Sequence, residues 1–264
     1  MITVVMPMAG LGSRFRSAGE TKPKPLIEVA GQPMFLLALG SLGNLLRDAQ
    51  VIAIVLAEHD AEFGIRRELE AKFPSVTVVT IPSLTGGSLE TCLAAEPFVT
   101  NKQAPVVVLD CDLTFQSDTY CGLLASIAAG SDEVGGVLLS FRSNEPCFSY
   151  ASSDLNGFVT KTAEKDPISD RALIGSYGFG SGELFFHIAS DIVGANQRTA
   201  NGEFYVSAAY NALIAEGYPV VIVNVDNYWS VGTPSQLASA LGDRQFADHA
   251  RVISAKVTKL TDGQ

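Results

Sequence analysis

The chain has 264 residues, 47% of them hydrophobic, which is enough to bury one large core, so we expect a single domain over residues 1–264. It carries 18 Lys and Arg against 28 Asp and Glu, a formal net charge of −10, which disfavours nucleic acid and anionic membranes as partners because both need an extended basic surface. The apolar runs are too short to span a membrane and no basic segment precedes the first of them, so we expect a cytoplasmic protein without a secretion signal.

Residues 3–26 read TVVMPMAGLGSRFRSAGETKPKPL: an apolar run, a glycine loop and a lysine–proline segment. Residues 3–8 predict a buried strand, and residues 9–14 predict the turn at its carboxyl end. Gly10 and Gly12 permit positive φ angles and leave backbone N–H groups open to a ligand. The segment holds four cations in an otherwise acidic chain: Arg14, Arg16, Lys22 and Lys24. This arrangement suits a triphosphate.

The glycine loop differs from two better-known phosphate-binding motifs. The dinucleotide fingerprint GxGxxG needs a third glycine where this chain has Phe15, and the pattern GxxxxGK[ST] is absent from the sequence. Taken alone, KPKP is typical of a polyproline linker. Because it follows a buried strand and a glycine–arginine loop, we favour the interpretation that its prolines hold Lys24 at a fixed reach.

The ordered set GLGSR, KPKPL and GQPM resembles the amino-terminal motif of the sugar-phosphate nucleotidyltransferases, or nucleoside-diphosphate-sugar pyrophosphorylases. The resemblance implies a Rossmann-like, three-layer α/β sandwich around a mostly parallel mixed sheet. It also implies a reaction in which an acceptor phosphate attacks the α-phosphorus of a nucleoside triphosphate and pyrophosphate leaves. Arg14 would stabilise the pyrophosphate, and Lys24 the α-phosphate or the acceptor phosphate. The implied nucleotide contacts at this loop are Met8, Ala9, Gly10, Leu11, Gly12 and Ser13.

Beyond this loop, short apolar strands alternate with helices, the pattern of a parallel sheet covered on both faces. Ligands in such folds bind beyond the carboxyl ends of the strands. We expect an acceptor-binding subregion over about 134–215, richer in strands. The predicted strands are 26–29, 51–56, 76–81, 104–110, 134–141, 157–162, 173–179 and 220–225, and the predicted helices are 33–46, 61–72, 89–95 and about 202–216.

Gly86 and Gly87 follow the predicted strand 76–81 and precede a helix. The segment reads as an ordinary glycine turn with Ser88 as the helix cap. The resemblance instead implies that both glycines contact the base and ribose of the nucleotide. The two interpretations stay open.

The most apolar predicted strand ends in Leu109-Asp110-Cys111-Asp112. Side chains two residues apart share a face of a strand, so Asp110 and Asp112 could bind one Mg²⁺ ion, which prefers carboxylate oxygens. Capping of the following turn is the alternative. Leaving two half-buried carboxylates unpaired is costly, so we favour metal binding. In the family, the matching aspartate is Asp112.

Two later segments resemble the family's acceptor side, Glu164-Lys165-Asp166-Pro167 and Gly175-Ser176-Tyr177-Gly178-Phe179. Without the resemblance they read as a surface ion pair and a turn. With it, Lys165 is placed to neutralise a phosphate. Glu203 suits a helix start electrostatically, and by resemblance it hydrogen-bonds sugar hydroxyls. The implied acceptor contacts are Glu164, Lys165, Gly175, Tyr177 and Glu203.

The resemblance departs from the family at one metal ligand. Many members read W-x-D-x-G-T near the carboxyl terminus, and alignment on Gly232-Thr233 puts Ser230 in place of that aspartate. Three interpretations remain: Asp226 reaches the metal, Asp110 joins Asp112, or Asp112 and the triphosphate hold the metal. The departure also keeps open a non-catalytic nucleotide-sugar-binding protein. A nucleotide-sugar-dependent glycosyltransferase would explain Asp110-x-Asp112 but not GLGSR and KPKPL.

The four cysteines form no CxxC pair and the three histidines lack metal-ligand spacing, which favours four buried free thiols in a reducing compartment. The resemblance implies a nucleoside triphosphate and a sugar 1-phosphate as substrates, serving surface polysaccharide synthesis; another phosphorylated small molecule remains open as acceptor. The base and the oligomeric state, a homodimer among the options, stay open.

Overall fold

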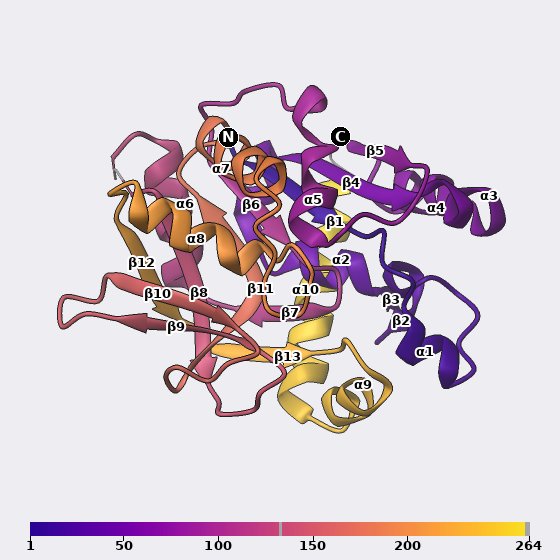
Figure 1. The fold of residues 1–264 in the computed structure, drawn as a ribbon. Coiled ribbons are helices and arrows are strands. Elements are labelled where there is room, and N and C mark those ends of the chain that lie inside the picture. Colours follow the sequence, from indigo (N-terminus) through magenta and orange to yellow (C-terminus); the bar gives the residue numbers. More distant parts are fainter. Residues whose placement is uncertain (132–133, 262–264) are drawn as a thin grey trace.

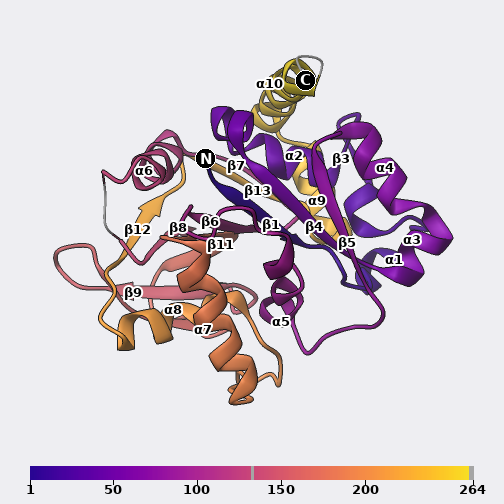
Figure 2. The same ribbon diagram turned by 90° about the horizontal axis from the view of Figure 1, so that it is seen from above.

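A nine-stranded mixed sheet runs through the centre of the molecule, and helices cover both of its faces (Figures 1 and 2). The computed structural model describes residues 1–131 and 134–261. The strand order is β10-β9-β11-β6-β1-β4-β5, with β8 paired to β11 and β12 paired to β8. This is the three-layer α/β arrangement expected from the sequence.

Four strands in one half of the sheet are parallel, and their sequences are almost continuously apolar, as burial on both faces requires. β1 (Thr3–Pro7) lies between β4 (Gln50–Leu56) and β6 (Val106–Leu109), and β5 (Val76–Ile81) pairs with β4 at the edge. Hydrophobic clusters fill both faces of these strands. The carboxyl ends of β1 and β6 therefore meet at one edge of the sheet.

The long strand β11 (Arg171–Phe179) joins this parallel half to an antiparallel half. It pairs with β6 and β9 along one side and with β8 along the other. The apolar pattern of the sequence did not predict β9 (Ser149–Ser153), because its residues SYASS lack an apolar alternation. The other strands here are β8 (Gly136–Arg142), β9 (Ser149–Ser153), β10 (Val159–Glu164) and β12 (Val220–Asn224).

The helices divide between the two faces: α2, α4, α6 and α10 bury side chains in one cluster and α5, α7 and α8 in the other (Figure 2). Among the described residues, none of these helices has the length and apolar character needed to cross a bilayer. The helices are α1 (Ser13–Ser17), α2 (Met34–Gly40), α3 (Ala57–Phe63), α4 (Ile65–Lys72), α5 (Ser88–Leu93), α6 (Asp118–Ala128), α7 (Gly182–Gly194), α8 (Val206–Ala215), α9 (Pro234–Leu241) and α10 (Arg244–Thr261).

Short elements complete the fold. Two small two-stranded sheets pair β2 (Glu28–Val29) with β3 (Gln32–Pro33) and β7 (Leu113–Gln116) with β13 (Asn227–Ser230). The 3-10 helices are η1 (Lys24–Leu26), η2 (Gly43–Asp48) and η3 (Glu96–Phe98). The β7–β13 pair ties the chain after β6 to the segment near Gly232.

Two predicted helices are each interrupted by a glycine. The helix expected over 61–72 is α3 followed by α4, because Gly64 adopts a left-handed conformation with φ of 61° between them. The helix expected over 33–46 is α2 followed by η2, which begins at Gly43 with φ of 55°. A left-handed residue ends the regular hydrogen-bond series of a helix, which explains both breaks.

The carboxyl-terminal helix α10 places His249 against the core. Its Nε2 lies 2.8 Å from Thr114 Oγ1, and its ring stacks on Trp229 with centroids 4.8 Å apart. Burial, and then the charge of Lys256, lowers the pKa of His249 to about 4. The folded protein therefore favours the neutral imidazole of His249.

We expect this histidine to make stability pH-dependent. Because its pKa is lower in the folded than in the unfolded chain, stability is full above about pH 6.5 and is lost as pH falls towards 4. The loss should be about 1–2 kcal/mol after allowing for partial exposure of the ring. Urea unfolding between pH 4 and 7 should show a flatter profile for His249→Gln than for wild type. An unchanged profile would contradict the assignment, and exposed His187, as His187→Gln, is the matched control.

Candidate active site

Two adjoining cavities open beyond the carboxyl ends of β1 and β6. The charged cavity, of about 420 Å³, is lined by most of the predicted charged residues, and the glycine cavity, of about 460 Å³, is lined by the two glycine segments. They share Pro7, Gly10 and Ser88 and therefore meet at the first loop. A cavity of about 720 Å³ between η2, β7 and α10 contains none of the predicted site residues.

The first loop divides its residues between the cavities. Met8, Gly10 and Gly12 line the charged cavity, whereas Ala9, Gly10 and Leu11 line the glycine cavity. Gly12 has a left-handed φ of 62°, which turns the chain into α1. Ser13 lines neither cavity. Arg14, on the first turn of α1, lines the charged cavity and has no hydrogen-bond or ion-pair partner among the described residues, so its guanidinium is available to an anion.

Lys24 and Asp112 form an ion pair in the charged cavity. Lys24 Nζ lies 2.6 Å from Asp112 Oδ2, and each side chain keeps about a quarter of its exposure, 25% and 27%. Burial alone would lower the pKa of Lys24, but the charge and hydrogen bond of Asp112 outweigh it and raise that pKa. The ammonium therefore stays protonated beside the cavity. Pro23 and Pro25 flank Lys24 at the start of η1 and fix the backbone there.

Asp110 lines the same cavity and, like Asp112, is half-buried. Burial, and then the charge of Asp112, raises the pKa of Asp110 to about 7 although Lys24 opposes the rise. Its backbone N–H donates to the Gly175 carbonyl oxygen at 2.7 Å, and a Cβ on Gly175 would lie only 2.2 Å from Asp110 Oδ2. Gly175 therefore makes room for the Asp110 carboxylate, which any side chain at residue 175 would displace.

The structure brings Asp110 and Asp112 together and leaves Asp226 outside. Asp226 is not among the residues lining the charged cavity, and its carboxylate accepts a 3.4 Å bond from the Asp118 N–H at the start of α6. Of the three ligand sets left open by the sequence, the one using Asp226 is therefore not supported. Among the described residues, no group of three or more His, Cys, Asp and Glu side chains gathers as a metal site.

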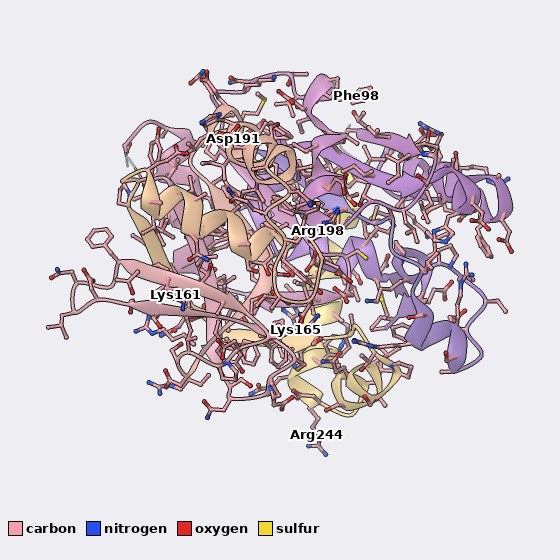
Figure 3. All side chains as sticks on the ribbon, viewed as in Figure 1. Phe98, Lys161, Lys165, Asp191, Arg198 and Arg244 are labelled. Carbon is pink, nitrogen blue, oxygen red and sulfur yellow. The ribbon has the colours of Figure 1, made fainter. Side chains whose placement is uncertain are left out.

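The acceptor-side residues predicted from EKDP and GSYGF also line the charged cavity. The side chain of Glu164 is 8% exposed and accepts hydrogen bonds from Ser149 and, at 3.0 Å, from Ser207. Lys165 has a left-handed φ of 54° and donates to Tyr205 Oη at 2.7 Å. Tyr177 is buried, which raises its pKa and keeps its hydroxyl neutral. A hydrogen-bonded carboxylate and a hydrogen-bonded ammonium, from adjacent residues, thus both line the charged cavity. Lys165 is labelled in Figure 3.

One acceptor residue predicted from the sequence lies elsewhere. Glu203 lines the glycine cavity, and its neighbour Tyr205 occupies the charged cavity instead. Sequence reasoning missed Tyr205, although it belongs to the same GEFYV segment. It also missed Gly232, where a Cβ would lie 2.5 Å from Asp112 Oδ2, and Ser149. Their roles depend on contacts between residues far apart in the chain.

Gly86 and Gly87 line the glycine cavity with little free backbone. The Gly86 N–H donates to Glu90 Oε2 at 2.5 Å and its carbonyl oxygen accepts from the Phe204 N–H at 2.9 Å. The Gly87 carbonyl oxygen accepts from Thr85 and Thr91. A Cβ on Gly87 would lie 2.4 Å from the Phe204 carbonyl oxygen. Both glycines therefore serve close packing on the segment before α8.

The cysteines differ in accessibility, contrary to the expectation of four buried thiols: Cys147 is exposed, Cys121 intermediate, and Cys92 and Cys111 buried. Cys147 lines the charged cavity. We expect iodoacetamide to label it first and NTP with Mg²⁺ to slow that labelling, read by mass spectrometry of tryptic peptides. Burial raises the pKa of Cys92, so faster labelling there would contradict the packing.

Sheet order and the cavities at its carboxyl edge place the chain in the nucleotide-diphospho-sugar transferase fold. The chain belongs to the nucleotidyl transferase family, whose model matches residues 3–245. The family identified from the GLGSR and KPKPL motifs is therefore confirmed.

Three relatives illustrate the match. The chain is 28% identical to the low-salt glycan biosynthesis nucleotidyltransferase Agl11 of Haloferax volcanii, over 89% of this chain and 64% of that protein. It is 26% identical to the bifunctional protein GlmU of Paraburkholderia xenovorans, over 94% of this chain and 53% of that protein. It thus spans between half and two thirds of their length. The structure of the nucleoside-diphosphate-sugar pyrophosphorylase from Vibrio cholerae RC9 matches with a TM-score of 0.76 and 25% identity, covering 91% of this chain and 100% of that one.

Proposed function

We propose that this protein transfers a nucleoside monophosphate from a nucleoside triphosphate to a sugar 1-phosphate or a similar phosphorylated small molecule, releasing pyrophosphate in the cytoplasm. The observation that carries the proposal is the charged cavity itself, where Arg14, Lys24 and Lys165 lie with the Asp110–Asp112 pair beyond the carboxyl ends of β1 and β6. Transfer between two phosphates needs charge neutralisation and alignment more than a protein nucleophile.

Each cation has a distinct place in this reaction. An oxygen of the acceptor phosphate attacks the α-phosphorus in line, the bond to the bridging oxygen breaks, and pyrophosphate leaves with its electron pair. Lys24, fixed by Asp112 at 2.6 Å, is suited to the α-phosphate. Arg14, which has no described partner, is suited to the leaving pyrophosphate, and Lys165 to the acceptor phosphate.

Asp110 and Asp112 fit a divalent cation by their chemistry. Burial, and then the charge of the neighbouring Asp112 carboxylate, raises the pKa of Asp110, and two such close carboxylates favour an added positive charge. Mg²⁺ is commonly held by one or two carboxylates together with substrate phosphates. When bound, Mg²⁺ would supply further charge neutralisation on the phosphates. Ser230 replaces the family's usual second aspartate, and Asp110 compensates for it in this proposal.

The acceptor-side residues of the charged cavity are suited to a sugar phosphate better than to a bare phosphate. Glu164 is held by Ser149 and Ser207, so its carboxylate is fixed to accept from sugar hydroxyls, and Tyr177 lies near it. Lys165 and Tyr205 offer donors in the same cavity. The Haloferax relative is named for glycan biosynthesis, which supports a nucleotide sugar for surface glycan synthesis as the product.

Thermal unfolding with ATP, GTP, CTP, UTP and several nucleotide sugars, each with and without Mg²⁺, tests the proposal. A ligand at 100 times its dissociation constant adds about 2.7 kcal/mol to the native state, so a site is visible before the acceptor is known. We expect a Mg²⁺-dependent rise in Tm with at least one triphosphate. A response to nucleotide sugars alone would instead indicate a glycosyltransferase or a non-catalytic binder.

A further inference from the structure

The geometry points to Arg198 as the residue that selects the base of the nucleotide, by donating hydrogen bonds to a base with a carbonyl oxygen. This inference rests on the proposed function, because it assigns the glycine cavity to the nucleoside. Arg198 lies in the segment between α7 and α8 (Figure 3). It is one of the residues that line the glycine cavity.

The glycine cavity suits a flat heterocycle. Leu11 and Leu84 line it and remain 43% and 52% exposed, although both are large and apolar. Single exposed leucines are common, but two on the wall of one cavity beside the phosphate-binding loop offer apolar surface to a planar ring. Among the described residues that line this cavity, Arg198 and Glu203 are the two with charged side chains.

The two glycines of the turn have few backbone groups left to contact a base. Both polar groups of Gly86 are already paired, with Glu90 and with Phe204, and the Gly87 carbonyl oxygen is paired with threonines. Discrimination between bases requires donors or acceptors aimed at base edges. With these glycine groups engaged, a side chain on this wall is well placed to supply them.

Arg198 is held in place with donors to spare. Its Nε–H donates to Asn196 Oδ1 and its Nη1–H to the Gly202 carbonyl oxygen, both at 2.8 Å, and its guanidinium lies 4.2 Å from the Phe204 ring centroid. A guanidinium has five N–H donors, so three remain without a described partner. A Cβ on Gly86 would lie 2.7 Å from Nη1 and 3.0 Å from Nη2. The free donors therefore lie directly against the glycine turn.

These donors favour carbonyl bases over adenine. Guanine presents O6 beside N7 and cytosine O2 beside N3, two adjacent acceptors for a guanidinium fork, and uracil presents carbonyl oxygens as well. Adenine has no carbonyl oxygen, and its amino group would meet another donor. Such a bidentate contact discriminates between bases by about 5- to 150-fold.

Equilibrium binding of ATP, GTP, CTP and UTP with Mg²⁺, by calorimetry, tests this on wild type, Arg198→Ala, Arg198→Lys and the control Arg244→Ala, an exposed arginine on α10. We expect wild type to bind at least one carbonyl nucleotide 5-fold or more tighter than ATP. Arg198→Ala should bring that ratio to within about 2-fold without changing the ATP affinity, Arg198→Lys should fall between, and Arg244→Ala should match wild type.

Three results would overturn the assignment: preference for ATP in wild type, an unchanged ratio in Arg198→Ala, or an equal loss for all four nucleotides, which would place Arg198 on a phosphate. Melting curves without ligand show whether each variant is folded. Pyrophosphate release is measured in parallel. A wild-type protein that discriminates in binding but releases no pyrophosphate with any acceptor would contradict the proposed function and leave the base selection standing.

Discussion

The Lys24→Ala variant should lose about 10²- to 10³-fold in kcat/KM for pyrophosphate release. Lys24 Nζ lies 2.6 Å from Asp112 Oδ2 in the charged cavity, and the pair keeps the ammonium charged. Its removal takes away a cation for the phosphates and leaves Asp110 and Asp112 facing them without it. Both effects disfavour a transition state rich in negative charge.

Lys22→Ala is the matched control, because it removes a lysine from the same KPKP segment. Lys22 is 54% exposed, pairs with Glu28 at 3.5 Å and lies outside both cavities, so its loss should change kcat/KM by less than about twofold. Activity is measured by coupled pyrophosphate detection. Equal activities of the two variants would show that Lys24 takes no part in the reaction.

The Gly232→Ala variant should lose about 10²-fold in activity while remaining folded. A Cβ at residue 232 would lie 2.5 Å from Asp112 Oδ2, so the carboxylate must move away from its position beside Lys24. The atom that moves ends a side chain and Gly232 has no positive φ, so the free energy of unfolding should change by less than about 1 kcal/mol.

Gly242→Ala provides the control for this substitution. A Cβ there would meet the Ser239 and Ala238 carbonyl oxygens at 3.5 and 3.6 Å, which are ordinary contacts, and the residue caps the carboxyl end of α9. We expect full activity. If Gly232→Ala is as active as Gly242→Ala, with both melting like wild type, the position of the Asp112 carboxylate does not limit the reaction.

The parallel half of the fold was predictable because its signals are local. Continuous apolar runs defined β1, β4, β5 and β6, and the glycine–arginine loop with KPKPL identified the family before any contact was known. The antiparallel half was harder to predict from the sequence. β9 is made of small polar residues and was missed, and β7 and β13 become strands by pairing with each other across more than a hundred residues.

The residues of the site also divide into those that local motifs predict and those that depend on the fold. Arg14, Lys24 and Asp112 follow from motifs, and the structure places all three on one cavity. The choice between Asp110 and Asp226 could not be made from spacing, because both follow strands; only the sheet order brings one of them to the cavity. Tyr205 and Gly232 could not be predicted because their places depend on contacts with distant residues: Tyr205 accepts a hydrogen bond from Lys165, and Gly232 lies against Asp112.

Transfer of label from an α-³²P nucleoside triphosphate to an acceptor would demonstrate the proposed reaction itself. Each of the four triphosphates would be incubated with Mg²⁺ and a panel of sugar 1-phosphates, and products separated by thin-layer chromatography. We expect one pairing to give a labelled nucleotide sugar with stoichiometric pyrophosphate, and both to form about 10²- to 10³-fold more slowly in Lys24→Ala. Label that stays in the triphosphate throughout, while the protein cleaves an added nucleotide sugar to a free nucleoside diphosphate, would contradict the proposed reaction.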